Sequence, residues 1–256
     1  MSRLHPFLDH PRPLAIAHRG GGMEAEENTL PAFARAVDLG YSHVELDVHA
    51  TADGEVVIHH DPTLARMCDD PRAIADLTLE ALRSVRTRGG AEIPRLADLF
   101  ETHPDLFVNI EAKSDAVVQP LADLIRSTGR LGRCGFGSFQ GARIGRLRDL
   151  LGDGLCASPD WRGVLALRLA GLGLPIAAPA AQMLQVPPSW KGVPVVVPSF
   201  LRAAHRFGLP VQVWTVNEGA EMVRLLDMGV DGLMTDRPTL LRDLLRKRGE
   251  WHGRIA

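Results

Sequence analysis

Short hydrophobic runs alternate with amphipathic stretches along the whole chain. Runs such as Leu14–His18 and Val211–Thr215 have the length and apolar content of strands that are buried on both faces of a sheet. On this pattern we predict eight strands, at Leu14–His18, His43–His49, Phe107–Glu111, Cys134–Ser138, Leu155–Ala157, Ile176–Ala178, Val211–Thr215 and Gly232–Thr235.

The stretches between these runs carry the signals of helices. Asn28-Thr29-Leu30-Pro31 offers a capping side chain followed by proline in the first turn, and Gly40, Gly152 and Gly229 follow helical patterns where a terminating glycine belongs. The predicted helices are Leu30–Leu39, Leu96–Thr102, Ala116–Ser127, Gly141–Leu151, Trp161–Ala170, Pro198–Phe207, Gly219–Met228 and Pro238–Arg248.

Regular alternation of strands and helices is typical of α/β proteins with parallel sheets. A (β/α)₈ TIM barrel runs to roughly 250 residues, which matches a chain of 256 residues. We therefore expect one barrel domain over residues 1–256. Residues 62–95 interrupt the alternation with a short helical run and turn residues, which predicts a small insertion after strand two.

Composition narrows the class of partner and compartment. The formal net charge is −2, so the chain has no overall positive field for nucleic acid, and an anionic ligand must be attracted locally. No signal peptide or long apolar span is visible, and the three cysteines form no CxxC motif. We expect a cytoplasmic protein without stable membrane insertion, and the sequence makes no prediction of oligomeric state.

Two carboxylates at strand spacing suggest a cation site. Glu45 and Asp47 are two residues apart in a strand-like run, so their side chains point the same way. Close carboxylates repel unless a cation lies between them, and hard oxygen ligands favour Mg²⁺ or Ca²⁺. The alternative is a solvent-facing edge strand, which the apolar neighbours of these residues argue against.

The following segment brings a histidine to the same place. Asp53-Gly54 is a strong signal for a two-residue hairpin loop, which pairs Ala52 with Glu55 and, further out, Asp47 with His60. His60 then lies beside Asp47. A one-residue bulge would exchange His60 for His59.

Other candidate site residues stand at the ends of predicted strands, where barrels carry their chemistry. His18 and Glu111 each end a strand, and Arg19 and Lys113 follow them with cations suited to phosphate. Trp214 ends the seventh strand and is either a wall of a substrate pocket or a core residue.

Together these residues resemble the glycerophosphodiester phosphodiesterase family. The matching segments run in order from residue 17 to residue 238, and include His18-Arg19-Gly20, Glu27–Phe33, Glu45-Leu46-Asp47-Val48, His60–Leu64, Glu111-Ala112-Lys113, Trp214–Asn217 and Thr235–Pro238. The resemblance implies a (β/α)₈ barrel with an insertion after strand two. It implies a divalent metal held by Glu45, Asp47 and Glu111, acid–base catalysis by His18 and His60, and phosphate contacts from Arg19 and Lys113.

The activity implied is hydrolysis of a glycerophosphodiester, a small-molecule substrate, to glycerol 3-phosphate and an alcohol. One alternative is a lysophospholipase D-like or phospholipase-like enzyme acting on lipid phosphodiesters. It would be marked by an exposed apolar rim near the insertion, and the sequence indicates none. A second alternative is a barrel that binds a phosphorylated ligand without turnover. The presence of both histidines and all three carboxylates argues against it.

Overall fold

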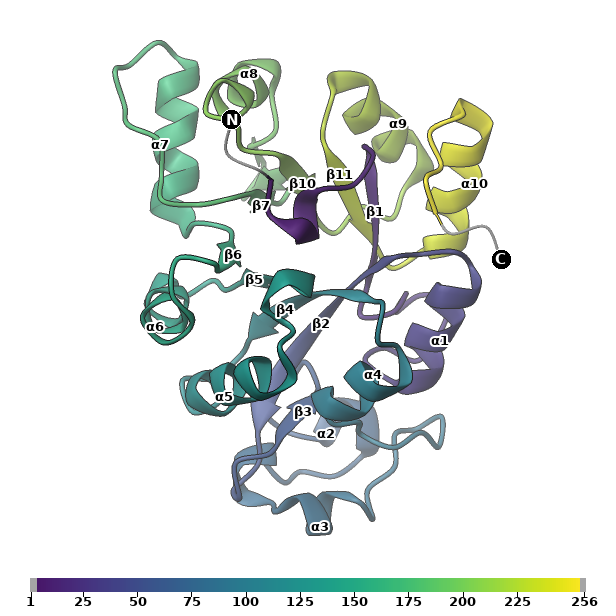
Figure 1. The fold of residues 1–256 in the computed structure, drawn as a ribbon. Coiled ribbons are helices and arrows are strands. Elements are labelled where there is room, and N and C mark those ends of the chain that lie inside the picture. Colours follow the sequence, from purple (N-terminus) through teal and green to yellow (C-terminus); the bar gives the residue numbers. More distant parts are fainter. Residues whose placement is uncertain (1–3, 254–256) are drawn as a thin grey trace.

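The computed structural model describes residues 4–253. Its centre is a sheet of parallel strands that curls into a nearly closed barrel (Figure 1), which confirms the predicted α/β barrel. Along the sheet the strands are ordered β6-β5-β4-β2-β1-β11-β10-β7. Their bounds are β1 Leu14–His18, β2 His43–Ala50, β4 Phe107–Ala112, β5 Cys134–Gly137, β6 Cys156–Ala157, β7 Leu184–Val186, β10 Val211–Val213 and β11 Gly232–Thr235.

The two ends of the sheet, near β6 and β7, are joined by isolated hydrogen bonds and not by a continuous ladder. The backbone N–H of Gln182 donates to the carbonyl of Ala157 at 3.2 Å, and the N–H of Gln185 donates to Oγ of Ser158 at 3.0 Å. These bonds bring β6 and β7 together, but the barrel is held by fewer backbone hydrogen bonds here than between its other strands.

Helices cover the outside of the barrel (Figure 1). They agree with the predicted helices to within two residues, because caps and terminating glycines fix their ends. Thr29 caps the first one, its Oγ1 accepting a hydrogen bond from the N–H of Ala32 at 3.3 Å. The bounds are α1 Leu30–Asp38, α4 Leu96–Thr102, α5 Val118–Thr128, α6 Gly141–Leu151, α7 Trp161–Gly171, α8 Pro198–Arg206, α9 Gly219–Met228 and α10 Pro238–Arg248.

The predicted insertion follows an antiparallel strand, β3 (Val56–Ile58), that folds back on β2. It contains two short helices, α2 (Ala65–Cys68) and α3 (Leu79–Leu82), and a 3₁₀ turn at Ile74–Asp76. The insertion buries a small cluster of its own against Val57 and extends from one side of the barrel, at the bottom of Figure 1.

The sixth predicted strand was wrong. Residues Ile176–Ala178 form no strand, and β7 lies eight residues later at Leu184–Val186. Prolines flank the predicted run, and Ala177 and Ala178 are exposed. This apolar segment therefore lies on the surface and is not part of the buried sheet. Leu184 and Val186 are buried and pair with β10 instead.

An unpredicted hairpin joins β7 to α8. Its strands are β8 (Ser189–Trp190) and β9 (Val193–Pro194), and both are exposed. The turn residues Lys191 and Gly192 have φ values of 48° and 80°. This left-handed turn lets two very short strands reverse direction.

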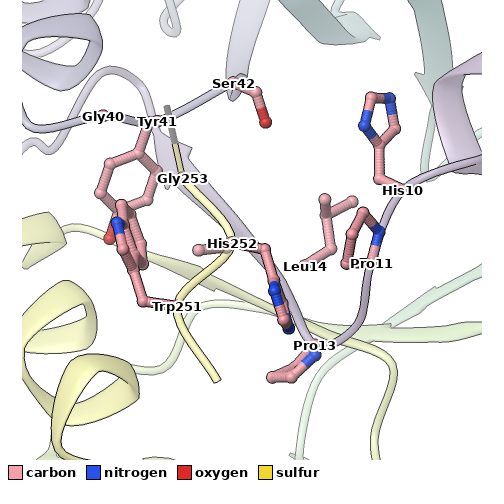
Figure 2. Close-up of a pocket in the computed structure, with 11 residues that line it drawn as sticks. His10, Pro11, Pro13, Leu14, Gly40, Tyr41, Ser42, Trp251, His252 and Gly253 are labelled. Atoms are coloured by element: carbon pink, nitrogen blue, oxygen red, sulfur yellow. The ribbon is translucent and has the colours of Figure 1, made fainter. Parts of the chain in front are cut away.

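Aromatic rings close the amino-terminal end of the barrel. His43 stacks on Phe107 with ring centroids 4.8 Å apart, and Phe7 and His10 pack edge-on against them. A hollow of about 30 Å³ lies nearby, between the start of β1 and Trp251 (Figure 2). It has room for only about one or two water molecules. Within residues 4–253, no helix is both long and apolar enough to cross a membrane.

Candidate active site

Strand register brings the predicted residues together at the carboxyl end of the barrel. His18, the last residue of β1, lies opposite Glu45 on β2. Asp47 lies two residues further along β2 and opposite Glu111 on β4. Neighbouring residues in parallel register point to the same side of a sheet, so three adjacent strands contribute to one site.

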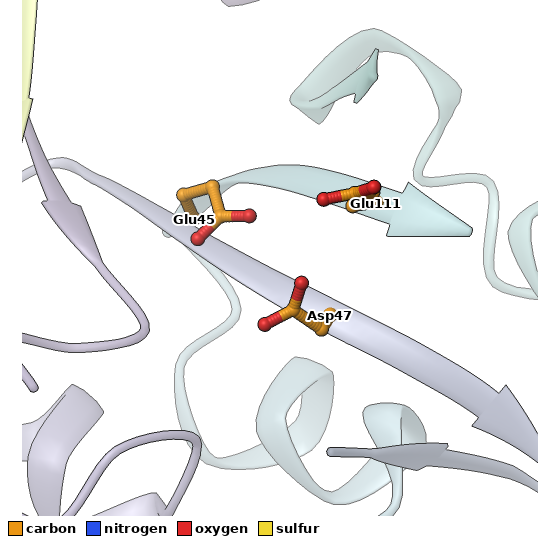
Figure 3. A group of neighbouring side chains, drawn as sticks. All are labelled: Glu45, Asp47 and Glu111. Carbon is orange, nitrogen blue, oxygen red and sulfur yellow. The ribbon is translucent and has the colours of Figure 1, made fainter. Parts of the chain in front are cut away.

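The three carboxylates form a compact group (Figure 3). One oxygen from each of Glu45, Asp47 and Glu111 lies within 4.8 Å of the others. Glu45 is 5% exposed and Asp47 is 1% exposed. Burial, with the negative charges of the neighbouring carboxylates, raises the pKa of Glu45 and of Glu111 despite the cations beside them.

This donor set fits a hard divalent cation. It consists of carboxylate oxygens only, which suits Mg²⁺ or Ca²⁺ better than softer metals. Burial and the neighbouring carboxylates raise the pKa of Glu45 and of Glu111, so their negative charge is not fully balanced by the side-chain cations. A cation among them would balance that charge.

Two side-chain cations flank the group. Nζ of Lys113 lies 3.4 Å from Oδ1 of Asp47 and 3.4 Å from Oε2 of Glu111. Nε of Arg19 lies 3.1 Å from Oδ2 of Asp47, and its Nη1 donates to Glu27 at 3.2 Å. Both cations also line the cavity described below, so they can contact an anionic ligand there.

His18 lies between two carboxylates. Its Nδ1 is 2.6 Å from Oδ1 of Asp236, and its Nε2 is 3.6 Å from Oε2 of Glu45. Burial lowers the pKa of His18, but the charge of Glu45 and the hydrogen bond and charge of Asp236 outweigh burial and raise it. The Asp236 carboxyl has a lowered pKa, because hydrogen bonds from His18 and Asn217 outweigh its burial.

His60 also reaches the site, although the predicted hairpin register was wrong by one residue. The observed pairs are Val48 with Ile58 and Ala50 with Val56, which puts His59 rather than His60 opposite Asp47. β3 ends at Ile58, and the last backbone hydrogen bond between the two strands runs from the N–H of His59 to the carbonyl of Asp47 at 2.9 Å. After that His59 turns inward toward the carbonyl of Thr63, while His60 lines the cavity.

Sequence reasoning missed the carboxylates that hold the histidines. Nδ1 of His60 lies 2.6 Å from Oδ1 of Asp61, the next residue in the chain. Asp236 lies in the matching segment Thr235–Pro238, but the sequence assigned it no role in the site; it contacts His18 from 218 residues away. Its signal was its place directly after β11, at the same end of the barrel as His18.

The first loop also serves the site. In the capping segment Asn28-Thr29, Thr29 provides the cap of α1, whereas Nδ2 of Asn28 donates to Oδ2 of Asp47 at 3.0 Å. The glycines of this loop allow close packing within the protein. A Cβ on Gly20 would lie 2.8 Å from Cβ of Ala32, and a Cβ on Gly21 would lie 2.6 Å from Cγ of Pro238.

These side chains open into a cavity of about 1010 Å³. Its polar end is lined by His18, Arg19, Glu45, His60, Glu111 and Lys113. Its other walls are largely apolar and come from α7, the β8–β9 hairpin and the loops after β5 and β10. Trp214 lines this cavity and packs edge-on against Phe139, with ring centroids 5.4 Å apart, and it also packs against the buried cluster of Leu14, Ile16 and Met234. It therefore contributes to both pocket and core.

A parallel barrel with histidines, carboxylates and cations around one cavity at the carboxyl ends of its strands has the architecture of a barrel enzyme for an anionic substrate. Comparison with known proteins identifies it further. The model of the glycerophosphoryl diester phosphodiesterase family matches residues 18–240. The chain therefore belongs to this family and is a phosphoric diester hydrolase.

Relatives that match over nearly the whole of this chain carry the name of the same family. A protein of Mycobacterium tuberculosis named probable glycerophosphodiester phosphodiesterase 2 is 38% identical over 254 residues, which cover 96% of each chain. A glycerophosphodiester phosphodiesterase of Caldanaerobacter subterraneus is 31% identical over 93% of this chain and 100% of its own. The crystal structure of a putative glycerophosphoryl diester phosphodiesterase from Silicibacter pomeroyi has the same fold, with a TM-score of 0.78 at 24% identity over 96% of this chain and 97% of its own.

Proposed function

We propose that the enzyme is a metal-dependent glycerophosphodiester phosphodiesterase that releases glycerol 3-phosphate and an alcohol, with His18 and His60 as its acid–base pair. One observation carries this proposal. Two histidines, each hydrogen-bonded at Nδ1 to a carboxylate, line the same cavity as the cluster of Glu45, Asp47 and Glu111.

Each group has a place in phosphodiester cleavage. A divalent ion held by the three carboxylates would supply Lewis acidity at the phosphoryl group. Arg19 and Lys113 bind the phosphate and offset the charge that develops on its oxygens. This arrangement accounts for the two cations beside a cluster that is otherwise acidic.

The histidines move the protons. One accepts the proton of the attacking hydroxyl as the new P–O bond forms, and the other donates a proton to the alcohol oxygen as the old P–O bond breaks. A carboxylate at Nδ1 fixes the ring and its tautomer, so Nε2 exchanges the proton. The attacking hydroxyl belongs to the glycerol itself, giving a cyclic phosphate that water then opens.

A second candidate activity is favoured by the apolar walls of the cavity. The sequence indicated no apolar rim near the insertion, but in the structure α7 and the β8–β9 hairpin line the cavity and carry exposed apolar side chains. An acyl chain fits such walls, and a lysophospholipid carries one next to its phosphodiester. Lysophospholipase D activity would use the same polar end of the cavity.

A product assay separates the two activities. Glycerophosphocholine, glycerophosphoethanolamine and a lysophosphatidylcholine are each incubated with the enzyme and Mg²⁺, Ca²⁺ or chelator. We expect glycerol 3-phosphate from the first two substrates with metal and none with chelator. Release of choline from the lysophospholipid alone would favour the second activity, and turnover of none of the substrates would contradict the proposal.

A further inference from the structure

Helix α7 presents an apolar face that no other described element covers. The helix packs on α8, with Leu167 and Ala170 buried, and the two are so close at Gly171 that a Cβ there would lie 2.7 Å from the carbonyl oxygen of Ser199. On the outer side Trp161 is 64% exposed and Leu172 is 72% exposed. In Figure 1 this helix lies at the edge of the molecule beside α8.

The β8–β9 hairpin continues this face. Trp190 is 56% exposed and Val193 is 62% exposed, on either side of the turn at Lys191. The hairpin and α7 line the same cavity as the catalytic residues. We call their exposed apolar side chains, together with that of Phe139, the apolar rim: Phe139, Trp161, Leu165, Leu172, Trp190 and Val193.

Charge distinguishes the segment that builds most of this rim. From Trp161 to Asn217 the sequence contains no aspartate or glutamate and five lysines or arginines. Because the whole chain has a net charge of −2, the remainder carries −7. The overall charge therefore conceals a strong division between this segment and the rest of the molecule.

Cations accompany both rim tryptophans. Arg162 lies over the ring of Trp161 at 5.6 Å, and Lys191 follows Trp190 and is exposed. Asp160, the acidic residue that directly precedes this segment in the sequence, caps α7, with Oδ1 accepting hydrogen bonds from the N–H groups of Arg162 and Gly163 at 3.1 and 3.3 Å. Its charge is thus directed at the helix end.

We propose that the apolar rim docks on an anionic lipid surface, with the mouth of the active-site cavity turned toward the lipid. Tryptophan with neighbouring lysine or arginine is the combination that settles at the boundary of headgroups and acyl chains. Basic residues add attraction to anionic headgroups. A second copy of this chain fits less well, because a symmetric contact would set the cations of one rim against those of the other.

This docking extends the proposed function, since a lipid surface supplies phosphodiesters with acyl chains, but binding is measured without turnover. The protein is mixed with vesicles of phosphatidylcholine, or of phosphatidylcholine and phosphatidylglycerol in equal parts, and sedimented. We expect binding to the anionic vesicles, with a blue shift of tryptophan fluorescence, and weaker binding to the neutral ones.

Two matched pairs of charge reversals test the surface. Arg162→Glu with Lys191→Glu alters the rim, and Arg246→Glu with Lys247→Glu makes the same charge change on α10, on the far side of the molecule in Figure 1. Circular dichroism checks the folding of both. We expect the rim pair to weaken binding by about tenfold or more and the α10 pair to have a small effect. Trp161→Ala with Trp190→Ala should remove the fluorescence shift.

Three results would overturn the docking. They are no binding to anionic vesicles, equal loss of binding by both charge-reversed pairs, and a dimer in solution that the tryptophan variant dissociates. If vesicle binding fails while the wild-type enzyme still hydrolyses glycerophosphocholine, the docking is wrong and the proposed function stands. If the protein binds the anionic vesicles but hydrolyses none of the substrates, the docking stands and the proposed function is wrong.

Discussion

Pairs of side chains give the site its character at the scale of single residues. Both candidate catalytic histidines hold a carboxylate 2.6 Å from Nδ1. Asp47, almost fully buried, is contacted by Arg19, Asn28 and Lys113. Such contacts fix rotamers, so the reacting atoms are positioned before a substrate arrives.

Replacing either histidine should slow the reaction strongly. General acid–base groups contribute roughly 10²–10⁴-fold, so we expect His18→Ala and His60→Ala each to lower kcat by such a factor in the glycerophosphocholine assay. His59→Ala is the matched control, because His59 is the adjacent histidine but contacts Thr63 instead of the cavity. Unchanged kcat in His60→Ala would rule out its assigned role.

Asp236 is expected to act as a positioning residue through His18. Asp236→Asn removes a charged partner of Nδ1 and should lower kcat by about 10–100-fold with little change in KM, because it does not line the cavity. Asp231→Asn is the control, since Asp231 lies at the opposite end of β11 and pairs with Arg12 and His205. An equal kcat loss in both variants would indicate a merely structural effect.

The sequence could identify site residues that follow strand periodicity. Glu45, Asp47 and Glu111 were found from spacing two and strand ends. Asp236 could not be paired with His18 from sequence, because the contact joins positions 218 residues apart through closure of the barrel. The roles of the three carboxylates in metal binding and of the histidines in catalysis stay predictions.

Among the elements, turns and edges departed from prediction more than strands and helices did. In the hairpin after β2 the backbone N–H of Thr51 donates to the carbonyl of Glu55 at 3.0 Å, which leaves a loop of three residues between them. Oγ1 of Thr51 supports this loop, because it accepts from the N–H of Glu55 at 2.9 Å and donates to Asp53 at 2.6 Å. Those side-chain bonds shift the register by one residue. Strand β7 was missed because Gln185 interrupts its apolar pattern, pointing instead to Asn109 and Gln212.

Two glycines should respond oppositely to alanine. Gly21 in the β1–α1 loop has φ of 105° and no room for a Cβ beside Pro238, so Gly21→Ala should destabilise the fold by about 1–3 kcal/mol. Gly145 lies inside α6 with nothing within 4 Å of a built Cβ, so Gly145→Ala should stabilise it by about 0.5–1 kcal/mol. Thermal and urea unfolding measure both, and a stabilised Gly21→Ala variant would contradict the packing described.

At the scale of the whole molecule, the polar site lies at the ends of the barrel strands, whereas the apolar rim lies on the helix, hairpin and loop that connect them. Strand alternation predicted the barrel because each buried strand and each amphipathic helix carries its own local pattern. The rim was not predicted, since its residues are scattered over α7, the loop after β5 and a hairpin that only the folded chain brings to one cavity. Cytoplasmic location and a single-domain organisation stay predictions.

The cysteines report on unfolding of the barrel. Burial raises the pKa of Cys134 and of Cys156 to about 12 and that of the partly exposed Cys68 to about 11. At pH 8 we expect thiol reagents to modify Cys68 slowly and the other two only on unfolding. Rapid modification of Cys134 in the native protein would contradict its burial.

The same shifts predict how stability depends on pH. Unfolded thiols ionise near pH 9, whereas the folded ones stay protonated to higher pH, so the folded state binds more protons above pH 9. The thiol contribution to stability is complete below pH 9 and is lost as the pH rises toward 12. Urea unfolding between pH 7 and pH 11 measures it, and a Cys134→Ala variant should show a shallower decline.

The central claim is that Glu45, Asp47 and Glu111 hold a divalent ion that the reaction requires. The most direct measurement is the rate of glycerol 3-phosphate release from glycerophosphocholine after chelator treatment, titrated with Mg²⁺ or Ca²⁺, for the wild type and for Glu111→Gln. We predict no activity without metal, saturable recovery in the wild type, and about 10-fold or more metal needed for half-recovery in Glu111→Gln. Full activity after chelation, or identical titrations for the two proteins, would contradict the account.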